Sequence, residues 1–403
     1  MAQTRRASLG AIFLTVFLDL LGFGLVLPFL AKEVRATFGV SEFAGTLLGS
    51  TYSLMQFFFV PVWGRLSDRI GRRPVLLWSV FATALSMAGL GAGLSIGTSL
   101  VWLYVARIFG GIATANLGVA SAYIADITKP EERTKSMGLI GAAFGLGFIL
   151  GPAIGGALSR IAINGHYGAV PCFVAASLSV VNLAWAFFGV GESLPTERRK
   201  QTEARSLSPL NFGAVRRASE LPGVPTAILV NFLVVLAFTN LDQTFTFFCT
   251  DAFSFTNLQT GGLLAGVGVV AALVQGGLIR PLSRRVSDAE FLRSGTFLQA
   301  IAFALIVAST HFGLLTLFLA MGLLAVGNGF TQPATSGFVS KHTPADEQGK
   351  LLSVNQSFAS LARTFGPALG GLLYTYRGMA WPYVAGSIGM VVACVASFRL
   401  PRK

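Results

Sequence analysis

The sequence predicts an all-α integral membrane protein with twelve transmembrane helices in two pseudo-symmetric six-helix bundles. Composition is the first reason: 53% of the 403 residues are hydrophobic and 12% are charged, whereas soluble domains carry about 25% charged residues. Long apolar runs are the second, because a membrane-spanning helix needs about 20 mostly apolar residues. An internal repeat is the third. This composition excludes most soluble proteins.

Twelve apolar runs predict the individual helices, six before a polar stretch and six after it. Their ranges are 8–30, 44–63, 75–95, 100–123, 137–158, 170–190, 226–248, 258–278, 296–310, 314–339, 351–374 and 381–398. The first run is too long for a secretory signal and lacks a small-residue cleavage site. We expect an N-terminal bundle over 1–191 and a C-terminal bundle over 226–403. The basic segment 192–225 is too short for a domain and predicts a cytoplasmic linker.

The 30 lysines and arginines are distributed unevenly between the loops. With the N-terminus placed in the cytoplasm, 24 of them lie on the cytoplasmic side, four on the opposite side and two within predicted helices. This asymmetry follows the positive-inside rule and predicts that both termini are cytoplasmic. The net charge of +13 therefore reflects membrane orientation and indicates no nucleic-acid partner.

One motif occurs in both halves of the chain. Residues 151–156 read Gly-Pro-Ala-Ile-Gly-Gly, and residues 366–371 read Gly-Pro-Ala-Leu-Gly-Gly, an offset of 215. The same offset aligns four charged positions with residues of the same type: Glu132 with Glu347, Lys135 with Lys350, Arg65 with Arg280 and Arg69 with Arg284. Parallel six-helix repeats are an architecture of secondary transporters, with the substrate site between the halves. Duplication in a non-transporting scaffold is the alternative.

The loop after the second predicted helix carries a candidate conformational latch. Gly64 and Gly71 are expected to let two helix ends approach and turn tightly. Asp68 and Arg72 are four residues apart and can form an ion pair, which Asp126, at the end of the fourth predicted helix, can join. Such a cluster can hold the cytoplasmic faces of the two halves and release them. An ordinary basic loop that fixes topology is the equal alternative.

The fifth predicted helix has a smooth, bent face. Gly147, Gly151 and Gly155 recur every four residues, which permits close helix packing, and Pro152 removes a backbone hydrogen bond and bends the helix. Static packing explains any single glycine. The full pattern favours a seam that stays closed to water and ions while the halves move.

Four charged residues within the predicted helices are candidates for proton coupling: Asp19, Arg107, Asp242 and Arg363. A charge at the centre of a membrane helix costs about 2.5–3.5 kcal/mol, so it faces a cavity or a partner. Burial favours a protonated carboxyl and a nearby arginine favours the carboxylate. Asp19 is therefore expected to be protonated reversibly as Arg107 approaches or leaves. Permanent structural ion pairs, such as Arg363 with Asp242, are the alternative.

Several of these segments resemble a known family. The loop 64–74, the fourth-helix run 103–111 around Arg107, the first-helix run 17–28 and the run 121–128 are similar to motifs of the major facilitator superfamily. The fifth-helix pattern resembles that of its drug/proton antiporter group, with Gly138, Gly147, Gly151, Pro152, Gly155 and Gly156. The closest resemblance is to the tetracycline-efflux-like branch. It implies the major facilitator fold, a proton-transfer role for Arg107 and location in a bacterial inner membrane.

The resemblance also implies that the first, fourth, seventh and tenth helices line a central cavity. Polar and aromatic residues on or near these helices are the candidate substrate-binding set, although each can instead tie helices together or face lipid. They are Phe23, Gln56, Thr114, Asn116, Phe238, Asn240, Gln243, Asn328 and Gln332. Two acidic positions of tetracycline carriers are Ser86 and Gln299 here, which weighs against tetracycline as the substrate.

The function expected from the sequence is alternating-access transport, with proton-coupled export of drug-like or amphiphilic molecules. A proton-coupled importer of a metabolite is the first alternative. A non-transporting receptor or a lipid-modifying enzyme is the second. The three histidines lie in separate loops and the cysteines lack metal-ligand spacing, so we expect no catalytic site, metal or cofactor. The expected partners are a small-molecule substrate, protons and the lipid bilayer, with the chain acting as a monomer.

Overall fold

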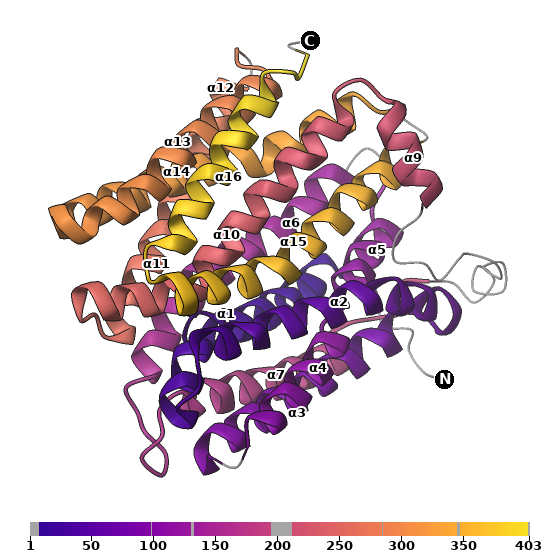
Figure 1. Ribbon diagram of the computed structural model, residues 1–403. Coiled ribbons are helices and arrows are strands. Elements are labelled where there is room, and N and C mark those ends of the chain that lie inside the picture. The colour runs from indigo at the N-terminus through magenta and orange to yellow at the C-terminus, as the bar shows by residue number, and fades with distance from the viewer. Residues whose placement is uncertain are drawn as a thin grey trace, which may run out of the picture. The chain divides into compact units, whose positions relative to one another are not determined.

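The computed structural model describes residues 8–97, 99–129, 133–194, 212–283, 285–344 and 347–401, and this part of the chain consists of helices joined by turns and loops (Figure 1). Its helices are α1 (Leu9–Phe38), α2 (Glu42–Ile70), α3 (Arg72–Ile96), α4 (Leu100–Ala113), α5 (Leu117–Ile127), α6 (Arg133–Leu158), α7 (Ala169–Gly189), α9 (Phe212–Glu220), α10 (Val224–Phe253), α11 (Asn257–Leu273), the π-helix η2 (Val274–Leu278), α12 (Ile279–Leu282), α13 (Asp288–Phe312), α14 (Leu314–Lys341), α15 (Gln348–Arg377) and α16 (Trp381–Ser397). The all-α prediction is confirmed.

Each predicted apolar run lies in one helix or in two consecutive ones. Ten segments of the described chain are long and apolar enough to cross a membrane. The two remaining runs are α16, which is apolar but 17 residues long, and α15, whose polar residues lower its hydropathy. The fourth run divides into α4 and α5, and the eighth divides into α11 and η2. Several helices continue past their apolar run; α1, for example, ends at Phe38 with Gly39 in a left-handed conformation.

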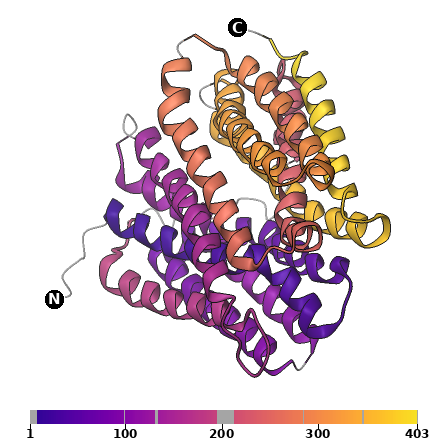
Figure 2. The ribbon, with the colours of Figure 1, turned by 90° about the vertical axis from the view of Figure 1, so that its left-hand side faces the viewer.

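Contacts divide the chain into two compact units. Unit 1 comprises Met1–Val40, Thr51–Pro209 and Asn257–Ala265, and unit 2 comprises Ser41–Ser50, Leu210–Thr256 and Gly266–Lys403. In unit 1, α1 packs against α6 and α7, and α3 packs against α4 and α7. In unit 2, α10 packs against α15 and α16, and α13 packs against α14 and α16; Figure 2 shows the yellow α16 alongside the orange helices. The predicted bundles, 1–191 and 226–403, stay a prediction.

Parts of the repeat and the linker lie outside the described residues, namely Glu132, Arg284 and positions 195–211, and the side chains of Lys135, Arg280 and Lys350 are not described. Where the linker is described, it contacts helices. Arg217 of α9 donates from Nε to Glu347 Oε2 at the start of α15, over 2.9 Å. Glu192 and Ser193 contact α3 and α5, as set out below.

Candidate functional site

Asp19 of α1 is held by two side-chain amides in unit 1. Its Oδ2 accepts from Asn116 Nδ2 (3.2 Å) and its Oδ1 accepts from Asn182 Nδ2 (3.1 Å). Asn182, on α7, also donates to the carbonyl oxygen of Thr15, one turn before Asp19. Asn116 lies in the break between α4 and α5. Both partners are neutral donors, so they stabilise the carboxylate without cancelling its charge. Sequence analysis assigned no role to Asn182.

Arg107 of α4 is fully buried, with 1% of its surface exposed. The ring of Tyr52 lies over the guanidinium, 5.2 Å from the Arg107 Cζ atom to the ring centroid. Nε and Nη2 of Arg107 have no hydrogen-bond partner. In this structure Asp19 bonds the two amides and Arg107 contacts the tyrosine ring, and the movement of Arg107 toward and away from Asp19 stays a prediction.

A chain of contacts joins Arg107 to other predicted residues of unit 1. The ring centroid of Phe23 is 5.4 Å from that of Tyr52. The hydroxyl of Thr114 contacts the Tyr52 hydroxyl, and Gln56 Nε2 donates to the Thr114 carbonyl oxygen (3.3 Å). Gly111 permits this approach, because a Cβ atom there would collide with the backbone of Tyr52. The structure thus brings Phe23, Gln56 and Thr114 together with Arg107.

The predicted residues of unit 2 are more dispersed. Asp242, 8% exposed, accepts from Gln243 Nε2 (3.2 Å). Asn240 donates to the Pro382 carbonyl oxygen (2.7 Å) and so ties α10 to α16. Arg363 donates from Nη2 to Ser360 Oγ (2.9 Å). Of the other predicted residues, Phe238 and Asn328 are half-buried, and Gln332 is exposed.

Arg72 is the centre of an ion-pair cluster, which we call the Arg72 cluster and define as Asp68, Arg72 and Asp126. Arg72 Nη1 lies 2.6 Å from Asp68 Oδ1, and Arg72 Nε lies 3.2 Å from Asp126 Oδ2. Gly71 makes the turn before α3, with φ +109°. Gly64 was expected to turn as well, but it lies inside α2, which continues to Ile70, with open space where a Cβ atom would be.

Two residues that the sequence did not single out complete this cluster. Oε1 and Oε2 of Glu192 accept the backbone N–H groups of Arg72 (2.8 Å) and Arg73 (3.3 Å), at the start of α3. A carboxylate there satisfies helix N–H groups that have no partner within the helix. Ser193 Oγ donates to Asp126 Oδ2 (3.0 Å). Glu192 is the first residue of the basic segment 192–225, and that position was the only available signal.

The glycines of α6 form a close interface with α1. A Cβ atom on Gly151 would lie 2.7 Å from Gly24 Cα, and one on Gly147 would lie 3.0 Å from Leu20 Cβ. Gly155 meets the backbone of Leu25 in the same way. Pro152 lies inside α6. The predicted smooth face is therefore the side of α6 that packs on α1 within unit 1.

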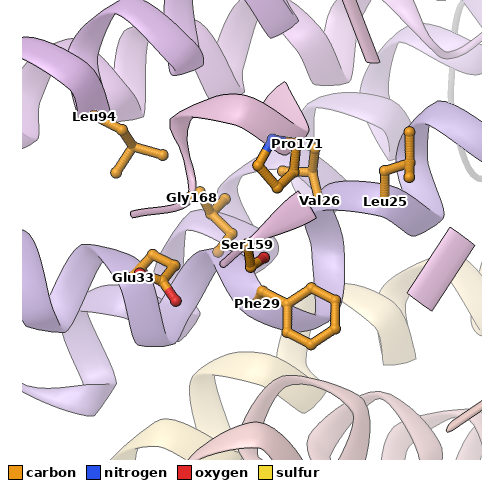
Figure 3. A pocket seen from close by; sticks show the side chains of 9 residues that line it. Leu25, Val26, Phe29, Glu33, Leu94, Ser159, Gly168 and Pro171 are labelled. Carbon is orange, nitrogen blue, oxygen red and sulfur yellow. The ribbon is translucent and has the colours of Figure 1, made fainter. Parts of the chain in front are cut away.

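A small recess in unit 1 contains a buried acid that the sequence analysis passed over (Figure 3). Glu33 lines it beside Ser159 and apolar side chains, is 5% exposed, and accepts from Asn257 Nδ2 (2.6 Å). Lys32 Nζ donates to the other end of the same amide (2.8 Å). The recess is small and lined mostly by apolar side chains, so it does not form a substrate site by itself.

Comparison with known proteins places these features in a family. The model of the Major Facilitator Superfamily matches residues 12–312 and 281–403. The chain is 32% identical over 391 residues to the class C tetracycline resistance protein of Escherichia coli, covering 96% of this chain and 94% of that protein. It is 28% identical to multidrug resistance protein 2 of Bacillus subtilis, covering 94% and 91%. The crystal structure of the human organic anion transporter MFSD10 superposes with a TM-score of 0.70, 26% identity and coverage of 96% and 98%.

Proposed function

Because the chain belongs to the major facilitator superfamily, and is therefore a membrane transporter and not an enzyme, we propose that it exports drug-like or amphiphilic small molecules in exchange for protons. The relatives named for tetracycline and multidrug resistance support export as the direction. Alternating access is the mechanism, with the bundles 1–191 and 226–403 moving against each other. The chain acts as a monomer in the bacterial inner membrane, with both termini in the cytoplasm.

Asp19 is the proposed proton carrier, and the observation that carries this proposal is its pair of amide partners. Asn116 and Asn182 donate to the carboxylate at 3.2 and 3.1 Å. A carboxylate bound by a buried arginine would be locked in its charged form, whereas one bound by neutral amides can gain and lose a proton without leaving an unpaired buried cation. Asp242, held by Gln243, is a second candidate carrier. Arg107 and Arg363 complete the proposed coupling set.

The remaining predicted residues have supporting roles in this mechanism. The Arg72 cluster is the conformational latch, together with the turn at Gly71. The interface of α6 with α1 is the seam that excludes water. Substrate contacts come from the aromatic and polar residues already described, which are Phe23, Gln56, Thr114, Asn116, Phe238, Asn240, Gln243, Asn328 and Gln332.

Proton-coupled export is tested in proteoliposomes under an imposed pH gradient. Accumulation of two drug-like probes of opposite charge, anionic fluorescein and cationic rhodamine 123, is followed by fluorescence in separate experiments, and internal pH is followed with trapped pyranine. The wild-type protein should move at least one of the probes and protons in opposite directions. Asp19→Asn should abolish the dependence on the gradient, and Asp19→Glu, which keeps a titratable group, should retain part of it. Gradient-driven accumulation that persists in Asp19→Asn would remove Asp19 from the mechanism.

A further inference from the structure

Arg107 carries a positive charge that the described part of unit 1 does not neutralise. Its side chain is 1% exposed, and it takes part in none of the recorded ion pairs of the described residues. Its electrostatic neighbours include Tyr52 and Cys172, both of which are ordinarily neutral at pH 7. Burying a cation without a partner is costly, so this position favours any anion that can reach it.

The unpartnered atoms of Arg107 have the geometry of an anion site. Nε and Nη2 both lack a hydrogen-bond partner, and in a guanidinium their N–H groups point along the same edge of the planar fork. Two parallel donors on one edge match the two oxygens of a carboxylate or sulfonate. Tyr52 lies over the face of the group and leaves the in-plane donors unoccupied. The free edge is therefore a bidentate donor site for an anion.

Asp19 does not fill this site. Each of its carboxylate oxygens accepts an amide hydrogen, one from Asn116 and one from Asn182. The second amide is fixed in turn by its bond to Thr15 (3.0 Å). Moving Asp19 onto Arg107 would break these bonds, whereas an incoming ligand would break none of them.

We infer that the transported molecule is an organic anion, whose carboxylate or sulfonate binds the free edge of Arg107. This inference rests on the proposed transport function and specifies its substrate class. The ring centroids of Tyr52 and Phe23 are 5.4 Å apart, and the Tyr52 ring contacts Arg107. These two rings supply apolar surface for the body of the molecule. A permanently cationic molecule of the same shape is repelled by the buried guanidinium. Arg107 is thus the residue that selects substrate charge.

The first test compares two probes that share a xanthene body and differ in charge. Fluorescein is anionic and rhodamine 123 is cationic at pH 7.5. Equilibrium binding to the detergent-solubilised protein is measured by fluorescence polarisation, which requires no gradient. We expect fluorescein to bind more tightly by about tenfold or more, and Arg107→Gln to remove that preference. Equal binding of both probes, tighter binding of rhodamine 123, or unchanged fluorescein binding in Arg107→Gln would overturn the inference.

The second test keeps Arg107 and supplies its missing counter-ion from the protein. Cys172 of α7 is fully buried and is an electrostatic neighbour of Arg107. Cys172→Asp places a carboxylate near the guanidinium, and Cys172→Asn is the neutral control of the same size. We expect the aspartate variant to lose fluorescein binding by about tenfold and the asparagine variant to keep it. Equal binding by the two variants would contradict the inference, and this comparison holds if Arg107→Gln does not fold.

Transport measurements separate this inference from the proposed function. If fluorescein binds in an Arg107-dependent way but neither probe responds to a pH gradient in proteoliposomes, proton-coupled export fails and the anion site stands. If the gradient drives rhodamine 123 and excludes fluorescein, export stands and the anion site fails.

Discussion

Replacing Gly151 by alanine tests whether α6 and α1 pack through their backbones. The Cβ atom of the new residue would lie 2.7 Å from Gly24 Cα, about 0.7 Å closer than the 3.4 Å at which ordinary van der Waals contact begins. Gly24 has no side chain that could rotate away, so the two helices must separate. Separation would also loosen the neighbouring contact of Gly147 with Leu20.

The expected magnitude comes from a matched control in the same helix. Gly145 of α6 has nothing within 4 Å of an added Cβ atom. Gly145→Ala therefore gains only helix propensity, up to about 1 kcal/mol. Gly151→Ala gains the same propensity and pays about 1–3 kcal/mol for overpacking. The difference between the two variants isolates the steric cost, which we expect to be about 1–3 kcal/mol in favour of Gly145→Ala.

The measurement is the free energy of unfolding in mixed micelles titrated with dodecyl sulfate, followed by the fluorescence of the five tryptophans. Unfolding free energies of the two variants that agree within about 0.5 kcal/mol would show that α6 and α1 are not in backbone contact. Such a result would refute the close interface.

Two further substitutions test the polar contacts of unit 1. Arg72→Ala leaves the carboxylates of Asp68 and Asp126 without their cation. Because both carboxylates are partly exposed (25% and 18%), we expect the unfolding free energy to fall by about 1–2 kcal/mol, and the stability of Arg72→Lys to lie between that of the alanine variant and the wild type. An alanine variant as stable as the wild type would contradict the ion-pair geometry. Asn182→Ala removes one of the two amide donors of Asp19, so we expect it to lower the free energy of unfolding by about 1.5–3 kcal/mol and to reduce proton flux in the pyranine assay. Proton flux equal to that of the wild type would show that Asp19 does not depend on this amide.

Sequence patterns predicted the features of this fold that depend on local spacing. Apolar runs located every long helix, because hydropathy is a property of consecutive residues. The contact of Asp68 with Arg72 followed from their i, i+4 spacing. The same reasoning was wrong about Gly64, because a glycine in the last two turns of a helix and a glycine in a turn look alike in sequence. Of these two glycines, Gly71 is the one with positive φ.

Features that depend on tertiary contacts were beyond the sequence. Asn182 lies 163 positions from Asp19, and a single asparagine in an apolar run gives no indication of its partner. Tyr52 was overlooked because an aromatic residue in a membrane helix is ordinarily a packing residue, and its role depends on Arg107 lying beneath its ring. Glu33 was not singled out, since the first apolar run ends at residue 30 while α1 continues to Phe38.

The repeated glycine–proline motif shows how one duplicated sequence serves two different interfaces. In unit 1, the first glycine of the motif, Gly151, meets the backbone of Gly24 on α1. In unit 2, its counterpart Gly366 meets the side chain of Thr239 on α10, together with backbone atoms of that helix. Backbone-to-backbone contact leaves no side chain that can adjust, whereas a threonine hydroxyl that bonds its own helix (2.8 Å to the Val235 carbonyl oxygen) can change partner.

The last glycine of the motif behaves alike in both copies. Gly156 approaches the backbone of Asn257 and Leu258 within unit 1, and Gly371 approaches Phe43 and Thr46 within unit 2. The offset of 215 that relates the two copies also relates Phe43 to Leu258, so the duplication preserves the partner as well as the motif. The contact of the last glycine is thus similar in the two copies, whereas that of the first glycine differs. We infer that the last glycine permits close approach in both copies, and that the first glycine has a packing partner specific to its own copy.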